Sequence, residues 1–176
     1  DLMYMRSGDG SDHYDGGTGN DTVDFTNTFL ATFVDLLNET WSFISTLGGH
    51  DMIDVENITT FDGNDTVIGS AADNDIYTEG GNDSVDGGAG DDKISGGGGD
   101  DTILGGDGSD TLGGGTDNDL IDGGAWADTI NGGSGNDTLL GGGGGDQIDG
   151  GYGNDSINGG GGDDFIDGGE WADTLK

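Results

Sequence analysis

The sequence predicts an all-β solenoid of stacked coils that is interrupted by one hydrophobic insertion. A nine-residue pattern, G-G-x-G-x-D-x-U-x, runs in phase for thirteen copies over residues 60–176, and U is always Val, Ile or Leu. A fixed short period is typical of solenoids, because a repeat with one apolar residue can bury it only against neighbouring repeats. Gly makes up 43 of the 176 residues, which favours tight turns at regular intervals.

Each repeat divides into a turn and a strand. The first six residues are rich in Gly and Asp and predict a turn. The last three, x-U-x, predict a minimal strand, in which U points to one face and both flanking residues point to the other. We expect two repeats to close one coil, so that consecutive turns lie on opposite sides and the U residues stack into one aliphatic column.

The N-terminal third is less regular. Residues 7–15 and 16–24 form two further repeats, and residues 25–59 break the frame with a hydrophobic composition. We therefore divide the chain into N-terminal repeats (1–24), an inserted β-rich flap or cap (25–59) and a thirteen-repeat roll (60–176). Within the insertion, partial alternation at 31–36 and 41–44 suggests strands, and a short helix at 33–40 is the alternative. A partner surface using Trp41 and Phe43 is the rival to a purely structural flap.

The sixth position of each repeat carries the candidate metal ligands. Stacking at roughly 4.8 Å would place each of these carboxylates one coil from the next. Oxygen ligands on a turn, in a chain with no Cys and two His, suit a hard cation, and Ca²⁺ better than Mg²⁺. The candidate aspartates are Asp12, Asp21, Asp65, Asp83, Asp92, Asp101, Asp110, Asp119, Asp128, Asp137, Asp146, Asp155, Asp164 and Asp173. The candidate turn glycines are Gly97, Gly99, Gly106, Gly108, Gly133 and Gly135.

Residues 7–24 and 60–176 resemble the RTX (repeats-in-toxin, haemolysin-type) family, whose signature is this same nonapeptide. The resemblance implies a parallel β-roll with Ca²⁺ between successive turns on each side. It also implies a secreted bacterial protein, exported by a type I system and folded outside the cell or at its surface. We expect the degenerate turn with Asn74 in place of Asp to bind calcium weakly or not at all.

Charge and composition bound the possible partners. A net charge of −34 with 29% hydrophobic residues is typical of a disordered chain. Roughly 8–11 Ca²⁺ would cancel much of that charge, so we expect metal binding and folding to be one event. The acidic charge excludes nucleic acid as a partner, and no apolar run is long enough to span a bilayer. Because the sequence stops on the last residue of a repeat, we expect it to be part of a longer chain.

Three functions remain open. The first is a calcium-dependent folding module that stabilises or presents neighbouring domains of a larger secreted protein. The second is a surface-layer, adhesin or filament element, and the third is a non-catalytic module of a secreted protease, lipase or alginate epimerase. We expect no enzyme activity, because the paired carboxylates recur along a convex array and His13 and His50 are isolated.

Two sets of apolar residues raise the question of further partners. Trp126 and Trp171 replace Gly at the fourth position on opposite turn rows, either as tolerated outward groups or as stacking platforms for a surface polysaccharide. Outward-facing leucines at one sheet suggest docking of the flap, a neighbouring domain or a second roll through lateral self-association. These leucines are Leu104, Leu120 and Leu140.

Overall fold

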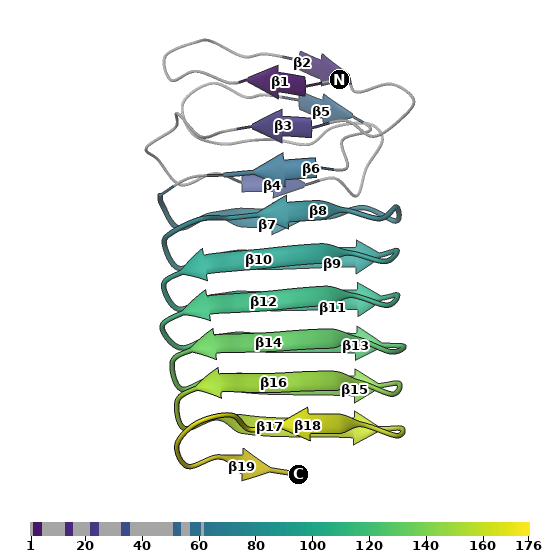
Figure 1. Cartoon of the computed structure of the whole chain (residues 1–176). Helices are drawn as coiled ribbons and strands as arrows, with labels where there is room; N and C mark the ends of the chain where they lie inside the picture. Colours follow the sequence, from purple (N-terminus) through teal and green to yellow (C-terminus); the bar gives the residue numbers. More distant parts are fainter. Residues whose placement is uncertain are drawn as a thin grey trace.

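The chain folds as a column of stacked β-coils. The computed structural model describes residues 2–4, 13–15, 22–24, 33–35, 51–53, 57–60 and 62–176. All regular elements in these ranges are β-strands, and Figure 1 shows them layered coil upon coil. The prediction of an all-β solenoid is therefore confirmed.

The strands fall into short and long groups. The three-residue strands of the N-terminal part are β1 (Leu2–Tyr4), β2 (His13–Asp15), β3 (Thr22–Asp24), β4 (Phe33–Asp35), β5 (Asp51–Ile53), β6 (Asn57–Thr59), β7 (Thr66–Ile68) and β8 (Asp75–Tyr77). The six-residue strands are β9 (Ser84–Ala89), β10 (Lys93–Gly98), β11 (Thr102–Asp107), β12 (Thr111–Thr116), β13 (Leu120–Ala125), β14 (Thr129–Ser134), β15 (Thr138–Gly143), β16 (Gln147–Tyr152) and β17 (Ser156–Gly161). Two short strands follow, β18 (Phe165–Asp167) and β19 (Thr174–Leu175).

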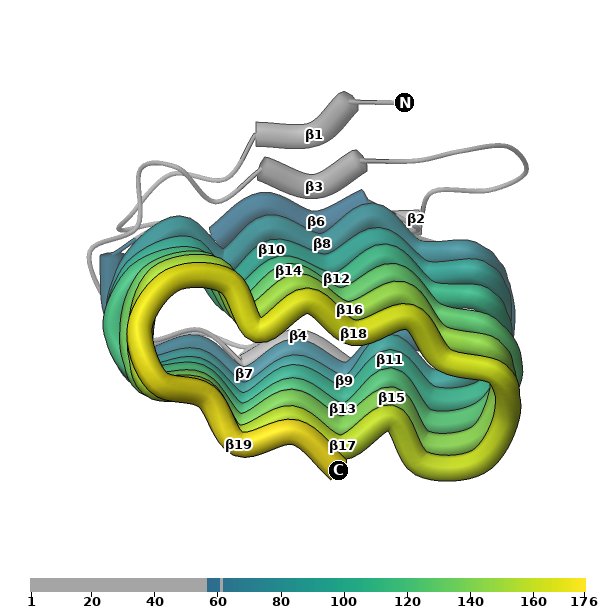
Figure 2. Tube along the Cα trace, turned by 60° about the horizontal axis from the view of Figure 1, so that its bottom comes forward, coloured from purple at the N-terminus to yellow at the C-terminus, as the bar shows by residue number. Residues whose placement is uncertain are grey.

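Two parallel sheets form the long sides of the column. One has nine strands in the order β1-β3-β6-β8-β10-β12-β14-β16-β18, and the other has eight in the order β4-β7-β9-β11-β13-β15-β17-β19. Paired residues are one coil apart: Ile94 pairs with Leu112, and Ile103 pairs with Ile121. Two nonapeptides therefore make one coil, as predicted. Figure 2 shows the flattened outline of the coil, with a turn at each end.

The core is one column of aliphatic side chains between the sheets. Every eighth-position residue from Val67 to Ile157 is at most 2% exposed, whereas the strand residues on either side of it point outward. Ile166 packs against the end of the column. The core residues are Ile58, Val67, Ile76, Val85, Ile94, Ile103, Leu112, Ile121, Ile130, Leu139, Ile148 and Ile157. The predicted aliphatic column is confirmed.

The regular strands are longer than predicted, because pairing continues through the glycines of the turn. Gly97 pairs with Gly115, and Gly98 pairs with Thr116. Gly97 has a φ of 98°, and a Cβ there would lie 2.0 Å from the carbonyl oxygen of Glu79. A second-position glycine therefore lets the backbones of adjacent coils approach and pair. Strands β7 and β8 stay short where Ser70 and Glu79 replace that glycine.

A flap that stands apart from the roll finds no support in the structure. Val34 of β4 pairs with Val67, and Ile58 of β6 pairs with both Val23 and Ile76. Strand β5 pairs with β2 in a small separate sheet. Strands β4 and β6 continue the two long sheets, because Val34 and Ile58 pair in register with the U residues Val67 and Ile76. A helix beginning at residue 33 is also wrong, since Phe33–Asp35 is a strand; Trp41 and Phe43 lie outside the described residues.

The outward leucines lie where the alternation predicts. Leu104 and Leu120 are each 41% exposed, and Leu140 is half-buried. Leu104 and Leu140 flank Asp122 in the register of the eight-stranded sheet. Their docking to a partner remains a hypothesis.

The core predicts a sharp contrast between two adjacent residues. Ile121→Ala opens a cavity in the aliphatic column and should lower the free energy of unfolding by about 2–5 kcal/mol. Leu120→Ala, on the outer face of the same strand, should cost less than about 1 kcal/mol. Chemical denaturation of both variants under identical conditions measures the difference. Equal losses would show that the column is not the core.

Candidate metal centre along the turns

The sixth-position side chains form two ladders, one on each row of turns. In the first, Asp101 lies one coil from Asp83 and one coil from Asp119, because each backbone N–H donates to the carboxylate of the next coil. The second begins with Asn74 and continues with Asp92 and Asp110 in the same pattern. The remaining members are Asp65, Asp137, Asp155 and Asp173 in the first ladder and Asp128, Asp146 and Asp164 in the second. The stacking predicted from the period is confirmed, and Asp12 and Asp21 lie outside the described residues.

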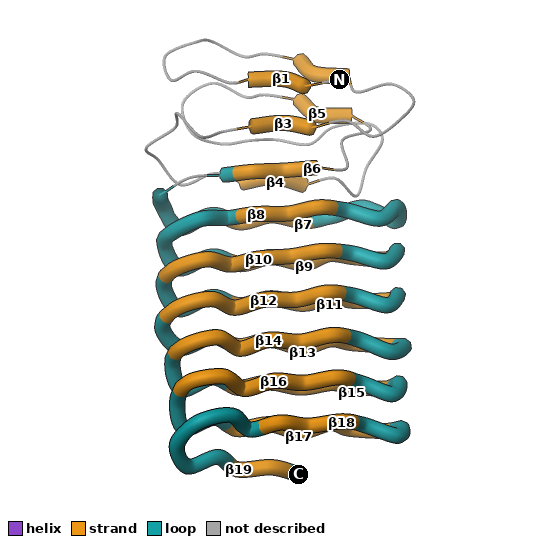
Figure 3. Tube along the Cα trace, viewed as in Figure 1, coloured by secondary structure: helices purple, strands orange, loops and turns teal. Residues whose placement is uncertain are grey.

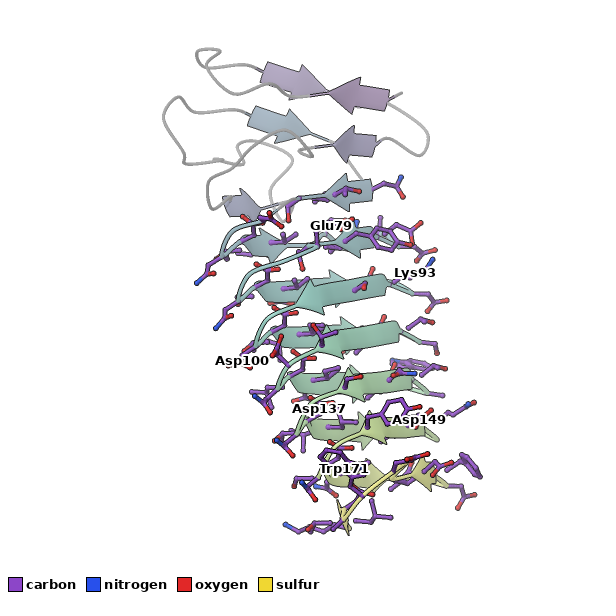
Figure 4. All side chains as sticks on the ribbon, turned by 60° about the vertical axis from the view of Figure 1, so that its left-hand side comes forward. Glu79, Lys93, Asp100, Asp137, Asp149 and Trp171 are labelled. Atoms are coloured by element: carbon purple, nitrogen blue, oxygen red, sulfur yellow. The ribbon has the colours of Figure 1, made fainter. Side chains whose placement is uncertain are left out.

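One carboxylate oxygen of each ladder aspartate has a defined partner. Asp101 Oδ1 accepts the backbone N–H of Asp83 at 2.8 Å, and Asp119 Oδ1 accepts that of Asp101 at 2.9 Å. The carboxylates point into the column, and Asp137 is only 1% exposed. The ladder thus fixes each side chain at the inner edge of its turn (Figure 4, where Asp137 is labelled).

In nine ladder aspartates the other carboxylate oxygen has no hydrogen-bond partner. Within the described residues, nine aspartates have a buried Oδ2 that accepts no hydrogen bond: Asp83, Asp92, Asp101, Asp110, Asp119, Asp128, Asp137, Asp146 and Asp155. A buried charged oxygen without a donor is strongly unfavourable. Each of these positions therefore requires either a proton or a cation beside Oδ2.

The first glycine of the repeat lets the ladder carboxylate pack closely against the backbone, because a Cβ there would collide with Oδ2. A Cβ at Gly96 would lie 2.2 Å from Asp101 Oδ2 and 3.0 Å from the carbonyl oxygen of Gly114 in the next coil. The same arrangement recurs at Gly114, with Asp119 Oδ2 at 2.2 Å and the carbonyl oxygen of Gly132 at 2.7 Å. A carboxylate oxygen of one coil and a backbone carbonyl oxygen of the next thus lie close to the same point. Lining by oxygen alone fits a hard cation such as Ca²⁺.

Burial makes the ladder carboxylates hard to ionise without a cation. Loss of hydration raises the pKa of Asp92 and Asp119 to about 7, and that of Asp83, Asp101 and Asp128 to about 6. Neighbouring carboxylates act in the same direction, and the backbone N–H bond opposes them. The structure therefore holds acidic groups in a place where their charge is unfavourable unless it is neutralised.

A family comparison agrees with this chemistry. The model of the RTX calcium-binding nonapeptide repeat matches residues 4–24 and, in overlapping stretches, the whole of 59–175. The chain belongs to the RTX calcium-binding nonapeptide repeat family. No curated protein gives a significant match. RTX repeats bind Ca²⁺, and the buried aspartate ladders are consistent with calcium sites.

Each RTX turn has few side chains that could coordinate a metal ion. Among the described residues, no three His, Asp or Glu side chains converge as a metal cluster. Calcium at an RTX turn would therefore rely on ladder carboxylates and backbone carbonyls together. The predicted ligand glycines all lie at the second or fourth position with positive φ, from 98° to 152°: Gly97, Gly99, Gly106, Gly108, Gly133 and Gly135. Their role as ligands stays a prediction, whereas sequence reasoning missed the carbonyls of first-position glycines such as Gly114, which border Oδ2.

A second, outer ladder was also missed. The backbone N–H of Asn118 donates to Asp100 Oδ1 at 2.9 Å, and that of Asn136 donates to Asn118 Oδ1 at 2.9 Å. These fifth-position side chains are exposed, and the hydrogen bonds from Asn118 lower the pKa of Asp100. The sequence carried a signal for it, since every second repeat from Asn64 to Asn154 has Asn or Asp at this position. Figure 3 shows the turns that carry these ladders.

No helix among the described residues is long and apolar enough to cross a membrane.

The raised pKa values predict that the calcium-free roll is most stable in mild acid. A ladder aspartate that titrates near pH 6–7 when folded, against 3.8 when unfolded, holds a proton that unfolding releases. Stability without calcium should therefore fall as pH rises from about 4 to about 7. Circular dichroism in calcium-stripped buffers should show more β-structure at the lower pH.

Adjacent aspartates supply the control for this pH dependence. Asp92→Asn removes a buried group whose pKa is about 7 and should weaken the dependence. Asp91→Asn removes the same charge from an exposed neighbour and should change it less. A calcium-free protein that gains structure between pH 4 and pH 7 would contradict the prediction.

Proposed function

We propose that this RTX roll is a calcium-dependent folding module of a larger secreted bacterial protein. Calcium binding outside the cell orders the coils, and the ordered column stabilises or presents the domains next to it. The observation that carries the proposal is the set of nine buried carboxylate oxygens without hydrogen-bond partners. These sites form only in the folded chain, so the free energy of metal binding contributes to the stability of the fold.

The overall charge supports the same coupling. The chain carries a net charge of −34 with 29% hydrophobic residues, and the core of the described residues is a single column of aliphatic side chains. A calcium-free chain of this composition lacks enough apolar burial to offset its conformational entropy and self-repulsion. Roughly 8–11 Ca²⁺ would add about +16 to +22 and remove most of the repulsion. Low calcium inside a cell and high calcium outside would then decide where the module folds.

The two candidate roles for the whole protein differ in the domains that would surround this module. A surface-layer, adhesin or filament element would have further rolls beside this one, joined through a face such as the one bearing Leu104 and Leu120. A module of a secreted protease, lipase or alginate epimerase would adjoin a catalytic domain. In either case we propose that the roll itself is non-catalytic, because its ladder carboxylates are buried inside the turns, away from any substrate.

The calcium site is tested by two aspartates of the same turn. Asp119→Asn removes a buried ladder carboxylate and should raise the calcium concentration needed at the affected sites by roughly 10-fold or more. Asp117→Asn removes an equal charge from an exposed residue and should have little effect. Circular dichroism during calcium titration gives both midpoints. Parent protein should lose β-structure in EGTA, and Mg²⁺ should replace Ca²⁺ poorly; full structure after exhaustive chelation at neutral pH would overturn the proposal.

We also propose a second function, binding of a neutral surface polysaccharide at one turn row. Tyr152 and Trp171 are 60% and 76% exposed and line a groove of about 410 Å³. Trp171 is held at a φ of 96°, a conformation that costs a bulky side chain strain and is found preferentially at functional sites. Polar groups of Ser134, Asn118 and Asn136 complete the lining. Aromatic faces beside amides and hydroxyls suit a sugar, and the acidic chain disfavours anions.

The two position-four tryptophans test this second function. Trp171→Ala should abolish retardation of the calcium-loaded protein in gels containing a neutral polysaccharide such as dextran or starch. Trp126→Ala is the matched control, because Trp126 is exposed with a φ of 81° on the other row and does not line the groove. Equal loss in both variants, or no retardation of the parent protein in a panel of neutral polysaccharides, would rule the site out.

A further inference from the structure

Three turns at the start of the regular roll depart from the pattern at the positions that border Oδ2. The first residue is Gly in every repeat from residue 87 onward, but it is Thr at Thr60 and Thr78. Both threonines are fully buried. On the other row, Asn74 replaces the sixth-position aspartate and is only 2% exposed. All three changes fall within residues 60–86, and both rows are affected.

The two threonines place a side chain where a regular repeat has only the hydrogen of glycine. Thr78 Oγ1 donates to the carbonyl oxygen of Gly96 at 2.9 Å, and Thr60 Oγ1 donates to that of Thr78 at 3.2 Å. These carbonyls are the equivalents of the Gly114 carbonyl that borders Asp101 Oδ2 in a regular turn. The oxygen that would face a cation already has a donor from the protein. The side chain itself occupies the place where a Cβ at Gly96 would meet the carboxylate.

The Thr78 hydroxyl also lies beside the ladder carboxylate of its own repeat. Burial raises the pKa of Asp83 to about 6, while the neighbouring N–H of Asp65 and the Thr78 hydroxyl both oppose that shift. Asp83 Oδ2 accepts no hydrogen bond of good geometry, because the hydroxyl proton goes to Gly96. The turn thus holds a protein hydroxyl near the carboxylate, whereas Gly96 has no side chain at the equivalent position.

Asn74 closes the corresponding turn on the other row. Its Oδ1 accepts the backbone N–H of Ser70 at 2.9 Å, and its Nδ2 donates to Ser70 Oγ at 3.4 Å. An amide carries no charge, so it does not need a cation. The hydrogen bonds between Asn74 and Ser70 stay within one turn and brace it.

We propose that the turns of residues 60–86 exclude Ca²⁺ and are closed instead by the side chains of Thr60, Thr78 and Asn74. Calcium sites then begin at Asp92 on one row and at Asp101 on the other. Residues 60–86 then form a first section of the roll that needs no metal, and the calcium-dependent coils that follow stack on it. This inference rests on the proposed calcium function and corrects the expectation that Asp65 and Asp83 sit at calcium sites like the others.

Counting bound calcium by native mass spectrometry tests the proposal. Thr78→Gly recreates the glycine and aspartate pair of a regular turn, so the calcium-saturated variant should bind one more ion than the parent protein. Thr78→Ser keeps the hydroxyl and should bind the parent number. The reverse change, Gly114→Thr, should remove one ion from the regular block.

The outcomes separate this inference from the function on which it rests. Binding of no calcium by the parent protein would sink both. Calcium binding with an unchanged count in Thr78→Gly would overturn the inference alone, as would a calcium-loaded crystal structure with an ion beside Thr78. If Thr78→Gly fails to fold, Thr60→Gly repeats the test at another turn. The ion count of Gly114→Thr is informative if circular dichroism shows that this variant keeps its β-structure.

Discussion

The buried carboxylate is the constraint on which this fold depends. Each regular turn places an aspartate at the inner edge of the coil, where one oxygen accepts a backbone N–H and the other meets no donor. The N–H bonds join every coil to the next and so contribute to the stacking. The unpaired oxygens make the same stacking unfavourable until a cation or a proton arrives. The cohesion of the coils and the proposed dependence on calcium therefore come from the same side chain.

Glycine makes this arrangement possible at two different positions. The first glycine of the repeat lets the ladder carboxylate approach the backbone, and the second lets the backbones of successive coils pair through the turn. Where Thr78 and Glu79 replace both glycines, the Thr78 hydroxyl donates to the Gly96 carbonyl and strand β8 has only three residues. The abundance of glycine thus reflects close approach of backbone to backbone and of carboxylate to backbone, and flexible linkage has no part in it.

Much of the roll could be predicted from the sequence, because strict period-nine repetition fixes register, coil size and core together. Ile94 over Leu112 follows from spacing alone. The length of β9 to β17 could not be predicted, because pairing across Gly-Gly depends on the distance between coils. The sequence prediction placed the strands within 25–59 in a flap, because longer spacing hid that β4 and β6 pair in register with the strands of the roll. The direction of Oδ2 and the hydroxyl of Thr78 depend on side-chain geometry that no motif encodes.

The most direct test of the account is hydrogen exchange, by NMR, of the backbone N–H groups that the ladder carboxylates accept. Those of Asp101, Asp119 and Asp137 belong to the regular block. At pH 7 the account predicts strong protection of all three with Ca²⁺ and its loss when calcium is removed. Equal protection of these groups in calcium-free protein at the same pH would contradict the claim that a cation holds the roll together.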